Sequence, residues 1–375
     1  MRKIKIFVCC TEQSGENICA NILSRINFDN IQVDGVCGRQ SEKYITNKIY
    51  DLSEFKSMGF FEIILSISKY LKMIKNLKNF IIKNNYDLIL TIDSPDFNYN
   101  LVNKLRKLNY NKQIIHIVAP TVWAWRSYRA KKFANIYDEI FLLFNFEKKY
   151  FDSQDLNKTF IGHPIFHIKK RKIKQKYKYI AFLPGSRQNE VLKLIKYFNH
   201  IEDYIYQNNL NFKIFIPTLP HLASLIKDLT KEWKTETFIS TDIKKFDDYY
   251  DDVYLSITCS GTASLEIAKR NIPQIVIYKL NYFTEIIFKP FIKVKYANII
   301  NIISKQMIIP EVVNSNLNKR KLLDCFLNLL NSKKNQENQI NLINLYIKEI
   351  VKEYSPYEVS VKRINNLINL SSRAN

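Results

Sequence analysis

Two carboxylates follow a short apolar stretch in the first third of the chain. Asp93 and Asp96 lie within residues 91–98, which read Thr-Ile-Asp-Ser-Pro-Asp-Phe-Asn. A carboxylate at the end of a buried strand can act as a general base if burial raises its pKa from about 3.9 toward the working pH. The alternative is structural, with Asp93 as a helix cap and Asp96 in the first helical turn. These residues alone leave both roles open.

A second motif is the turn at residues 259–266, Cys-Ser-Gly-Thr-Ala-Ser-Leu-Glu, which follows an apolar run and opens a predicted helix. Backbone N–H groups at a helix N-terminus bind anions, and the missing Cβ of Gly261 lets a phosphate approach Ser260 and Thr262. Glu266 lies one helical turn beyond Thr262, where a carboxylate can bind ribose hydroxyls. The motif favours a nucleotide site over its alternative, a capped helix with a solvent-facing glutamate.

A polar loop with the sequence Thr-Glu-Gln-Ser-Gly-Glu-Asn follows the first apolar run, at residues 11–17. Glu12, Ser14 and Gly15 suit contact with a polar ligand, because a helix opens directly after them. An ordinary strand-to-helix turn with a cap has the same composition, so the loop alone does not decide between the two.

Two of the three tryptophans lie one residue apart, at residues 119–126 (Ala-Pro-Thr-Val-Trp-Ala-Trp-Arg). Trp123 and Trp125, beside Arg126, can stack over a sugar or an acyl chain. The alternative is that at least one of them packs the loop against the sheet.

In the second half, Leu-Pro-Gly-Ser-Arg at residues 183–187 follows another predicted strand. Gly185 permits a tight turn, Ser186 can cap a helix, and the guanidinium of Arg187 can bind phosphate oxygens as a fork. The segment is not a P-loop, because it does not fit the pattern G-x-x-x-x-G-K-[ST].

Residues 60–82 have an amphipathic helical pattern. Large apolar residues recur at helical spacing, among them Phe60, Ile64 and Ile67. The basic residues between them are Lys69, Lys72, Lys75 and Lys78. Such a helix can lie in a membrane interface or pack on the sheet, and partial burial allows both.

The loop motifs stand at the ends of predicted strands. Continuous apolar runs are typical of parallel strands that are buried on both faces. They lie at 4–10, 88–92, 114–118 and 140–144 in the first half and at 180–183, 212–216, 253–257 and 273–278 in the second. Their alternation with helical segments, which occurs twice, predicts two open α/β sheets with ligands at the carboxyl ends of the strands.

A basic linker at residues 167–178 separates the two halves. We therefore predict one domain over residues 1–168 and a second over 169–350. The chain has a helical pattern from about residue 317, which Pro356 interrupts. Residues 351–375 are predicted to form a helix.

The composition indicates a cytoplasmic protein with an ordinary core. Of the 375 residues, 46% are hydrophobic. No apolar run approaches the roughly 18 residues of a membrane-spanning helix, and the first is too short for a signal peptide. The six cysteines form no C-x-x-C pair and the five histidines are scattered, which disfavours a metal site and disulfides. Only seven glycines occur, against about 26 at average usage, so each is expected where the backbone requires it.

The net charge of +22 has several explanations. Lysine is abundant throughout the chain, so compositional bias is one. The others are an anionic membrane surface, an anionic substrate and nucleic acid. Nucleic acid is disfavoured, because no RNP, helix-turn-helix or finger pattern is present.

Taken together and in order, these motifs resemble the lipid-A-disaccharide synthase family, which is glycosyltransferase family 19. The matching pieces are Ser14-Gly15, Met58-Gly59, residues 92–98, residues 122–126, Phe146-Glu147, residues 161–164, residues 183–187, residues 260–266 and Asn301. Asp-x-Pro-Asp-Phe-Asn and Val-Trp-Ala-Trp are highly specific, whereas Ser-Gly-Thr-Ala occurs in other nucleotide-sugar enzymes. The pieces lie between residues 7 and about 315, over most of the chain.

The resemblance implies a GT-B fold, with two Rossmann-like domains facing across a cleft and C-terminal helices crossing back to the first. It implies that residues 1–168 form the acceptor- and membrane-side domain, that residues 169–350 form the UDP-sugar-binding domain, and that the helix over 351–375 packs back on the first domain. It implies an inverting transfer from UDP-2,3-diacylglucosamine to 2,3-diacylglucosamine 1-phosphate, giving the β-1,6-linked disaccharide 1-phosphate and UDP. No metal or other cofactor is implied. The family works at the cytoplasmic face of the inner membrane, so the anionic surface becomes a partner and the basic helix gains a role.

The resemblance also implies roles for single residues. Asp93 matches the proposed base, which takes the proton from the acceptor's 6-hydroxyl. The residues implied to hold UDP are Arg187, Ser260, Gly261, Thr262, Glu266 and Asn301. Those implied in the acceptor and donor-sugar loops are Glu12, Ser14, Gly15, Asp96, Trp123, Trp125 and Arg126. The chain departs from the family pattern at Thr11, where a Gly is usual, and at Glu16, where an Asp is usual.

Two other classes remain as alternatives. Another GT-B enzyme, such as a UDP-N-acetylglucosamine epimerase or the peptidoglycan glycosyltransferase, shares the nucleotide half but lacks the two specific loops. A basic protein that binds nucleic acid or membrane would leave the ordered loops at strand ends unexplained.

Overall fold

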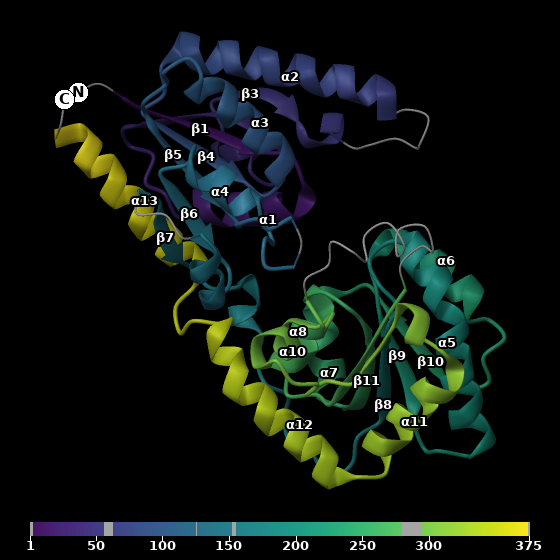
Figure 1. Cartoon of the computed structure of the whole chain (residues 1–375). Helices are drawn as coiled ribbons and strands as arrows, with labels where there is room; N and C mark the ends of the chain where they lie inside the picture. The colour runs from purple at the N-terminus through teal and green to yellow at the C-terminus, as the bar shows by residue number, and fades with distance from the viewer. Residues whose placement is uncertain (1–2, 56–62, 125, 152–154, 280–293, 374–375) are drawn as a thin grey trace. The chain divides into compact units, whose positions relative to one another are not determined.

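Parallel β-sheets form the centre of each of the two units into which the chain divides (Figure 1). The computed structural model describes residues 3–55, 63–124, 126–151, 155–279 and 294–373. Unit 1 consists of Met1–Phe166 and Glu349–Asn375, and unit 2 consists of His167–Lys348. The predicted α/β class with two Rossmann-like sheets is confirmed.

The sheet of unit 1 contains seven strands among the described residues, in the order β3-β2-β1-β4-β5-β6-β7, and its neighbouring pairs are parallel. They are β1 (Ile4–Cys10), β2 (Ile31–Cys37), β3 (Asn47–Asp51), β4 (Leu88–Ile92), β5 (Gln113–Ile117), β6 (Glu139–Leu142) and β7 (Asn157–Phe160). The order reverses between β1 and β4. In open α/β sheets, ligands bind beside the carboxyl ends of strands at such a switch point.

Helices cover both faces of this sheet (Figure 1). They are α1 (Gln13–Leu23), α2 (Ile63–Asn84), α3 (Pro95–Arg106), α4 (Arg129–Ala134) and α13 (Pro356–Arg373). Phe7 and Cys9 of β1 belong to the core beneath α2, α3 and α4, whereas Ile6 and Val8 belong to the core beneath α1 and α13. Alternating strand residues are thus buried on opposite faces, which explains the continuous apolar runs.

The sheet of unit 2 contains six strands among the described residues, in the order β10-β9-β8-β11-β12-β13, again with parallel pairs. They are β8 (Tyr179–Leu183), β9 (Lys213–Pro217), β10 (Thr237–Ser240), β11 (Val253–Cys259), β12 (Gln274–Tyr278) and β13 (Glu311–Val313). The order reverses between β8 and β11, so unit 2 has its own switch point.

The helices of unit 2 are α5 (Gln188–Gln207), α6 (Ala223–Leu229), α7 (Phe246–Tyr250), α8 (Thr262–Lys269), α10 (Ile299–Ser304), α11 (Lys319–Leu330) and α12 (Lys333–Tyr346). Phe182 of β8 lies in the core with α5, α6 and α11, and its neighbour Ala181 lies in the core with α7 and α8. The second sheet is therefore also covered on both faces.

The apolar pattern predicts eight of these strands to within two residues at either end and misses β2, β3, β7, β10 and β13. Four of the five stand at the edges of the two sheets, where β3, β7 and β10 are mostly half-buried. The remaining strand, β2, contains the buried polar residue Asp34 and Gly35. An edge strand needs less apolar side chain, which weakens the signal in the sequence.

The chain returns to unit 1 after α12, and α13 packs against α1 there. Arg363 of α13 donates from Nε to both carboxylate oxygens of Glu139 in β6, at 2.9 and 3.0 Å, and Glu139 is fully buried. Pro356 is the first residue of α13. Proline is common at this position, because the N–H group that it lacks would have no partner within the helix. Pro356 therefore interrupts the helical pattern of the sequence and also starts α13.

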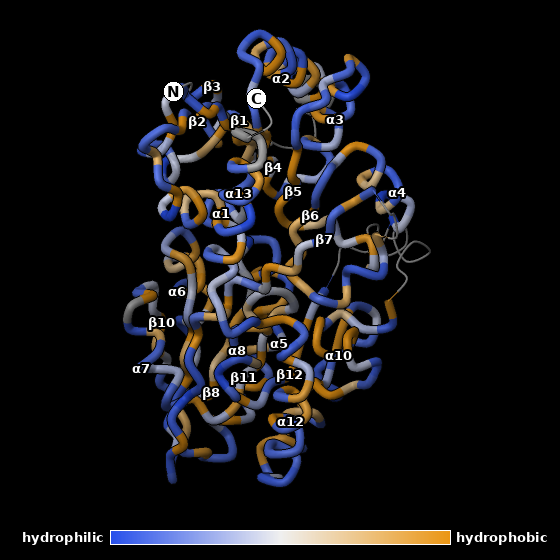
Figure 2. The backbone as a smooth tube through the Cα atoms, turned by 90° about the vertical axis from the view of Figure 1, so that its left-hand side faces the viewer, coloured by the Kyte–Doolittle hydropathy of each residue, from blue (hydrophilic) through white to orange (hydrophobic). Residues whose placement is uncertain are grey.

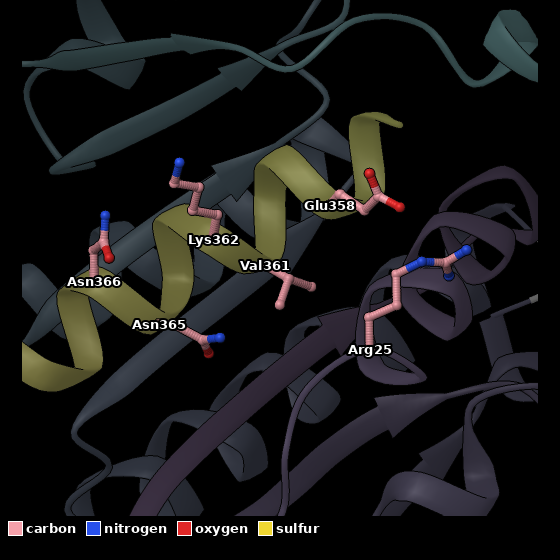
Figure 3. Close-up of a pocket in the computed structure, with 6 residues that line it drawn as sticks. All are labelled: Arg25, Glu358, Val361, Lys362, Asn365 and Asn366. Atoms are coloured by element: carbon pink, nitrogen blue, oxygen red, sulfur yellow. The ribbon is translucent and has the colours of Figure 1, made fainter. Parts of the chain in front are cut away.

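A cavity of about 470 Å³ lies along α13 near the end of α1 (Figure 3). Its lining residues are Arg25, Glu358, Val361, Lys362, Asn365 and Asn366. Arg25 Nη1 donates to the carbonyl of Asn21 at 2.6 Å, and its guanidinium lies over the ring of Tyr357. The arginine therefore takes part in the packing of the two helices.

No helix among the described residues is long and apolar enough to cross a membrane. The six cysteines are free thiols, five buried and one half-buried. Within the described ranges, no group of three or more His, Cys, Asp or Glu side chains is arranged to hold a metal ion.

Candidate functional site

Asp93 and Ser14 meet at the switch point of unit 1. Asp93 follows β4, and Ser14 lies in the first turn of α1, which follows the neighbouring strand β1. The Ser14 hydroxyl donates a hydrogen bond to Asp93 Oδ2 at 2.5 Å, and the Ser94 N–H donates to Oδ1 at 2.9 Å. Two loops that were predicted from separate motifs therefore form one site.

The backbone holds Asp93 in an unusual conformation. Asp93 and Ser94 both have positive φ, at 55° and 45°, in the left-handed region that residues with a Cβ seldom adopt. Such residues cost about 1–3 kcal/mol each and persist where the surroundings hold them. Buried Asn98 donates from Nδ2 to the Asp93 carbonyl at 2.7 Å, and the Asp93 N–H donates to Ile117 at 2.9 Å. The turn thereby leaves Asp93 half-buried at the edge of the sheet.

Gly15 makes the contact between the two loops possible. A Cβ added at Gly15 would lie 3.1 Å from both Asp93 Cβ and Cys10 Sγ, and 3.2 Å from the Ile92 carbonyl oxygen. These distances are tighter than ordinary van der Waals contacts, so a larger residue would push α1 away from the end of β4.

Glu16, the departure from the family's usual Asp, is buried behind this loop. Its carboxylate accepts hydrogen bonds from the N–H groups of Gly38 and Ser41, at 2.9 and 2.8 Å. The longer side chain thus ties the start of α1 to the loop that follows β2. Thr11, the second departure, is also buried, while Glu12 beside it is exposed as the N-cap residue of α1.

Asp96 lies differently from Asp93. It is in the first turn of α3, its side chain is 74% exposed, and it pairs with Arg129. Arg126 Nη1 lies 3.9 Å from its other oxygen, and Arg126 has a positive φ of 50°. Asp96 therefore helps to join α3 to the loop after β5, as the structural alternative predicts.

Trp123 is fixed by a buried carboxyl group that the sequence analysis does not assign to the site. Trp123 Nε1 donates to Glu147 Oε1 at 3.1 Å, and the Phe144 N–H donates to Glu147 Oε2 at the same distance. The Trp123 ring packs edge-on against Phe144 and Phe146. Burial raises the pKa of Glu147 to about 7. Trp125 lies outside the described residues.

Helix α2 is buried on one side only. Met73, Ile74, Leu77 and Ile81 belong to the core, whereas Ile67 and Leu71 are 55% and 51% exposed. Lys69, Lys72 and Lys75 are exposed and Lys78 is half-buried, and Lys69 Nζ donates to the Glu54 carbonyl at 2.9 Å. Phe60 and the side chain of Ile64 lie outside the described part of the chain. Figure 2 shows the alternation of hydrophobic and hydrophilic residues along α2.

In unit 2, the turn Ser260, Gly261, Thr262 lies at the switch point, between β11 and α8. Gly261 is the N-cap residue of α8 and has a φ of 124°. Among the described residues, a Cβ added there would meet nothing within 4 Å. The Ser260 hydroxyl donates to the Ala297 carbonyl at 3.1 Å. Exposed N–H groups at the start of α8 therefore remain available to an anion.

Arg187 follows β8, the strand beside β11 at this switch point. Its Nη1 donates to Glu190 Oε1 at 2.9 Å, and the side chain is 78% exposed. Gly185 has a φ of 118°, and a Cβ added there would lie 2.7 Å from Glu190 Oε2. Glu190 thus orients Arg187, and the positive φ at position 185 favours glycine there.

Glu266 and Asn301 have different surroundings. Glu266 is half-buried on α8. Burial raises its pKa, and the positive charges of Arg270 and His167 lower it by a smaller amount.

Asn301 is fully buried: its Nδ2 donates to Ile309 and Glu311, and its Oδ1 accepts from two backbone N–H groups. Because these four bonds use the whole amide, the side chain of Asn301 has no group left for a nucleotide. The structure therefore does not support direct contact between this side chain and the nucleotide. The Asn301 side chain instead holds the surrounding loop in place.

A buried polar network that sequence reasoning missed supports α8. The Ser264 hydroxyl donates to Gln274 Oε1 at 2.8 Å and accepts from Asn298 Nδ2 at 2.5 Å. Glu311 accepts from the N–H groups of Ala297 and Asn298, at 2.7 and 2.8 Å. Ser264 belongs to the motif at residues 259–266, but Gln274, Asn298 and Glu311 belong to no motif, so only the fold brings these residues together.

The sequence matches the family model described as lipid-A-disaccharide synthetase over residues 6–360. The chain belongs to the lipid-A-disaccharide synthase family. It is 34% identical over 345 residues to the lipid-A-disaccharide synthase of Rickettsia felis, covering 88% of this chain and 87% of that protein. It is 32% identical over 343 residues to the Rickettsia prowazekii enzyme, with the same coverage. The chain is therefore a glycosyltransferase of lipid A biosynthesis.

Solved structures show the same fold at low sequence identity. UDP-GlcNAc 2-epimerase from Neisseria meningitidis has a TM-score of 0.62 at 12% identity, covering 97% of this chain and all of that one. MurG from Acinetobacter baumannii has a TM-score of 0.61 at 12% identity, covering 97% and 99%. These likenesses establish the GT-B class of the fold.

Proposed function

We propose that this glycosyltransferase joins UDP-2,3-diacylglucosamine to 2,3-diacylglucosamine 1-phosphate with inversion at the anomeric carbon. The acceptor's 6-oxygen forms the new bond to that carbon as the bond to the UDP oxygen breaks. The hydroxyl proton passes to a carboxylate, and the electron pair of the broken bond leaves with UDP. The observation that carries the proposal is the Ser14–Asp93 pair at the switch point of unit 1.

Asp93 is the proposed general base. Its two oxygens accept one hydrogen bond each, from Ser14 and from the Ser94 N–H. A carboxylate has about four lone-pair positions, so it can still accept the proton of a sugar hydroxyl. These two bonds also fix the rotation of the carboxylate, which sets the direction from which the acceptor must approach.

The UDP moiety is proposed to bind at the switch point of unit 2. The start of α8 and the guanidinium of Arg187 present positive charge to the diphosphate, where negative charge grows as the sugar leaves. Glu266 is the proposed partner of the ribose hydroxyls. Ser260, Gly261 and Thr262 would contact the diphosphate through backbone N–H groups, while Asn301 holds the surrounding loop.

The diacylated substrates require access to a membrane, and α2 is the proposed contact. Its exposed side carries Ile67 and Leu71 together with Lys72 and Lys75. Apolar side chains can enter the headgroup region while the lysines attract anionic lipid. We therefore propose a peripheral association with the cytoplasmic face of the inner membrane.

The test is an assay with both substrates in the presence of EDTA, following UDP release and disaccharide formation. Acceptor-dependent UDP release with stoichiometric disaccharide would support the proposed reaction. If the folded protein binds UDP but forms no disaccharide, the activity is a different transfer from a UDP-sugar.

A further inference from the structure

A cavity of about 370 Å³ lies in unit 2 away from the proposed nucleotide site. Its lining residues are Lys170, Lys269, Asn344, Leu345, Ile347 and Lys348. Lys269 is the last residue of α8, which begins at the Thr262 turn. Eight helical residues rise about 12 Å, so the cavity is at the opposite end of this helix from the nucleotide turn.

The charges around this cavity are of one sign. Three of its lining residues are lysines, and none of the described residues that line it is an Asp or Glu. Lys269 is half-buried, and burial together with the charge of Lys170 lowers its pKa. Lys170 and Lys348 are exposed, so only Lys269 is partly buried. Like charges close together repel each other, and a bound anion relieves that repulsion.

Two other partly buried lysines have a carboxylate beside them. Lys174 Nζ lies 2.7 Å from Asp252, and Lys48 Nζ lies 2.5 Å from Asp51. Lysines near helix C-termini also interact with the free carbonyl groups there, and this applies to Lys269 in the last turn of α8. That interaction explains a lysine at the end of α8, but it does not explain the cavity or the two further lysines that line it.

We propose that Lys170, Lys269 and Lys348 bind a phosphate group at a site distinct from the UDP site. The Asn344 amide can add a neutral donor to the three ammonium groups. A second cavity of about 940 Å³ shares Lys170 and extends past Tyr177 and Ile173, the latter 95% exposed. It offers aromatic and aliphatic walls to the remainder of a phosphate ester, so either a free phosphate or a phospholipid headgroup fits this chemistry.

The test is calorimetric titration of the full chain with inorganic phosphate while UDP is saturating, so that the nucleotide site is filled. We expect one further phosphate to bind, and the double variant Lys170→Gln/Lys269→Gln to weaken that binding at least tenfold. The charge-matched control is Lys227→Gln/Lys319→Gln, two exposed lysines of the same unit. Equal affinity in wild type, double variant and control would overturn the proposal, as would no saturable binding to the wild type.

Two further measurements complete the design. Lys348→Gln changes an exposed residue, so it keeps the proposal testable if the double variant does not fold. Its phosphate affinity should also fall, and an unchanged value would exclude Lys348 from the site and contradict the proposal.

Flotation with phosphatidylglycerol vesicles then identifies the source of the phosphate. Weaker flotation of the double variant than of the control indicates a lipid headgroup, and equal flotation with weaker phosphate binding indicates a free phosphate.

Discussion

The Cα of Gly15 faces the side chain of Asp93 so closely that a methyl group between them would lie 3.1 Å from the Asp93 Cβ. This contact lets α1 begin directly beside the end of β4 and brings the Ser14 hydroxyl to the carboxylate. The position of the Ser14 hydroxyl beside the proposed base therefore depends on glycine at position 15, in the loop after β1.

Gly15→Ala should lower kcat by about 10- to 100-fold, because α1 must move and the Ser14–Asp93 hydrogen bond must lengthen. Overpacking of this kind costs about 1–3 kcal/mol of unfolding free energy, which a urea titration measures. Ser14→Ala is the comparison, since it removes the hydrogen bond without crowding. Full activity and unchanged stability of Gly15→Ala would contradict this prediction, because they would show that α1 can accommodate the methyl group without cost.

Asp93→Asn should reduce turnover by about 10²- to 10⁴-fold while the affinity for UDP stays within about twofold, because the residue acts on the acceptor. Steady-state assays and calorimetry give the two quantities. Asp96→Asn, three residues further on in the first turn of α3, is the matched control and should lose much less activity, since Asp96 is exposed and paired with Arg129. Comparable losses in both variants would argue against a special role for Asp93.

Glu266→Ala should weaken UDP binding by about tenfold, through loss of hydrogen bonds from the ribose to a charged acceptor. Calorimetric titration with UDP measures the change. Glu232→Ala removes an 86% exposed glutamate of the same unit and should leave the affinity unaltered. If Glu266→Ala binds UDP as tightly as the wild type, the ribose lies elsewhere.

Lys72→Glu/Lys75→Glu should reduce binding to anionic vesicles by at least about tenfold, since each lysine near such a surface contributes about 1 kcal/mol. Both residues are exposed on α2, so the fold should be preserved. The pair Lys227→Glu/Lys319→Glu makes the same charge change in unit 2. Equal losses in the two double variants would point to the overall charge rather than to α2.

Glu147 should make the stability of the protein depend on pH near neutrality. Its pKa is raised from 4.5 to about 7 in the folded state, so the folded protein binds more protons than the unfolded chain between these values. The contribution of Glu147 to the free energy of unfolding should therefore fall as the pH rises from about 5 to 8, by on the order of 3 kcal/mol.

Urea titrations across this range measure the effect of Glu147. Glu147→Gln keeps one acceptor oxygen for Trp123 or Phe144 and should remove this contribution, whereas the exposed Glu353→Gln should not. Two buried histidines act in the opposite direction: burial lowers the pKa of His163, stacked on Phe144, to about 4 and that of His116 to about 3, so their contribution to stability rises with pH up to about 6.5. The quantity to compare is therefore the wild-type profile minus the Glu147→Gln profile, and a difference that does not fall between pH 5 and 8 would contradict the assignment.

The sequence predicts the two sheets because their central strands are buried on both faces and leave unbroken apolar runs. It also predicts the site loops, because polar residues gather after those strands. The sequence does not predict that Ser14 donates to Asp93, since this depends on β1 and β4 being neighbours across a reversal in strand order. The edge strands are missed because their burial is incomplete.

The sequence pattern also does not predict the role of a residue when that role depends on packing between distant parts of the chain. Asn301 belongs to a motif, yet its amide is consumed by the loop around it. Glu147 is 24 residues from Trp123 in sequence, and only the fold shows that one holds the other.

The pairing of Glu139 with Arg363 has a consequence for the order of events on the ribosome. Glu139 is fully buried in β6, and the guanidinium that neutralises it follows 224 residues later, after the whole of unit 2. At bacterial elongation speeds, that separation corresponds to roughly 10–45 s of synthesis. During this interval the Glu139 carboxylate lacks its ion pair with Arg363, and among the described side chains only the Thr159 hydroxyl can already donate to it. Unit 1 therefore gains this ion pair only after α13 has been synthesised.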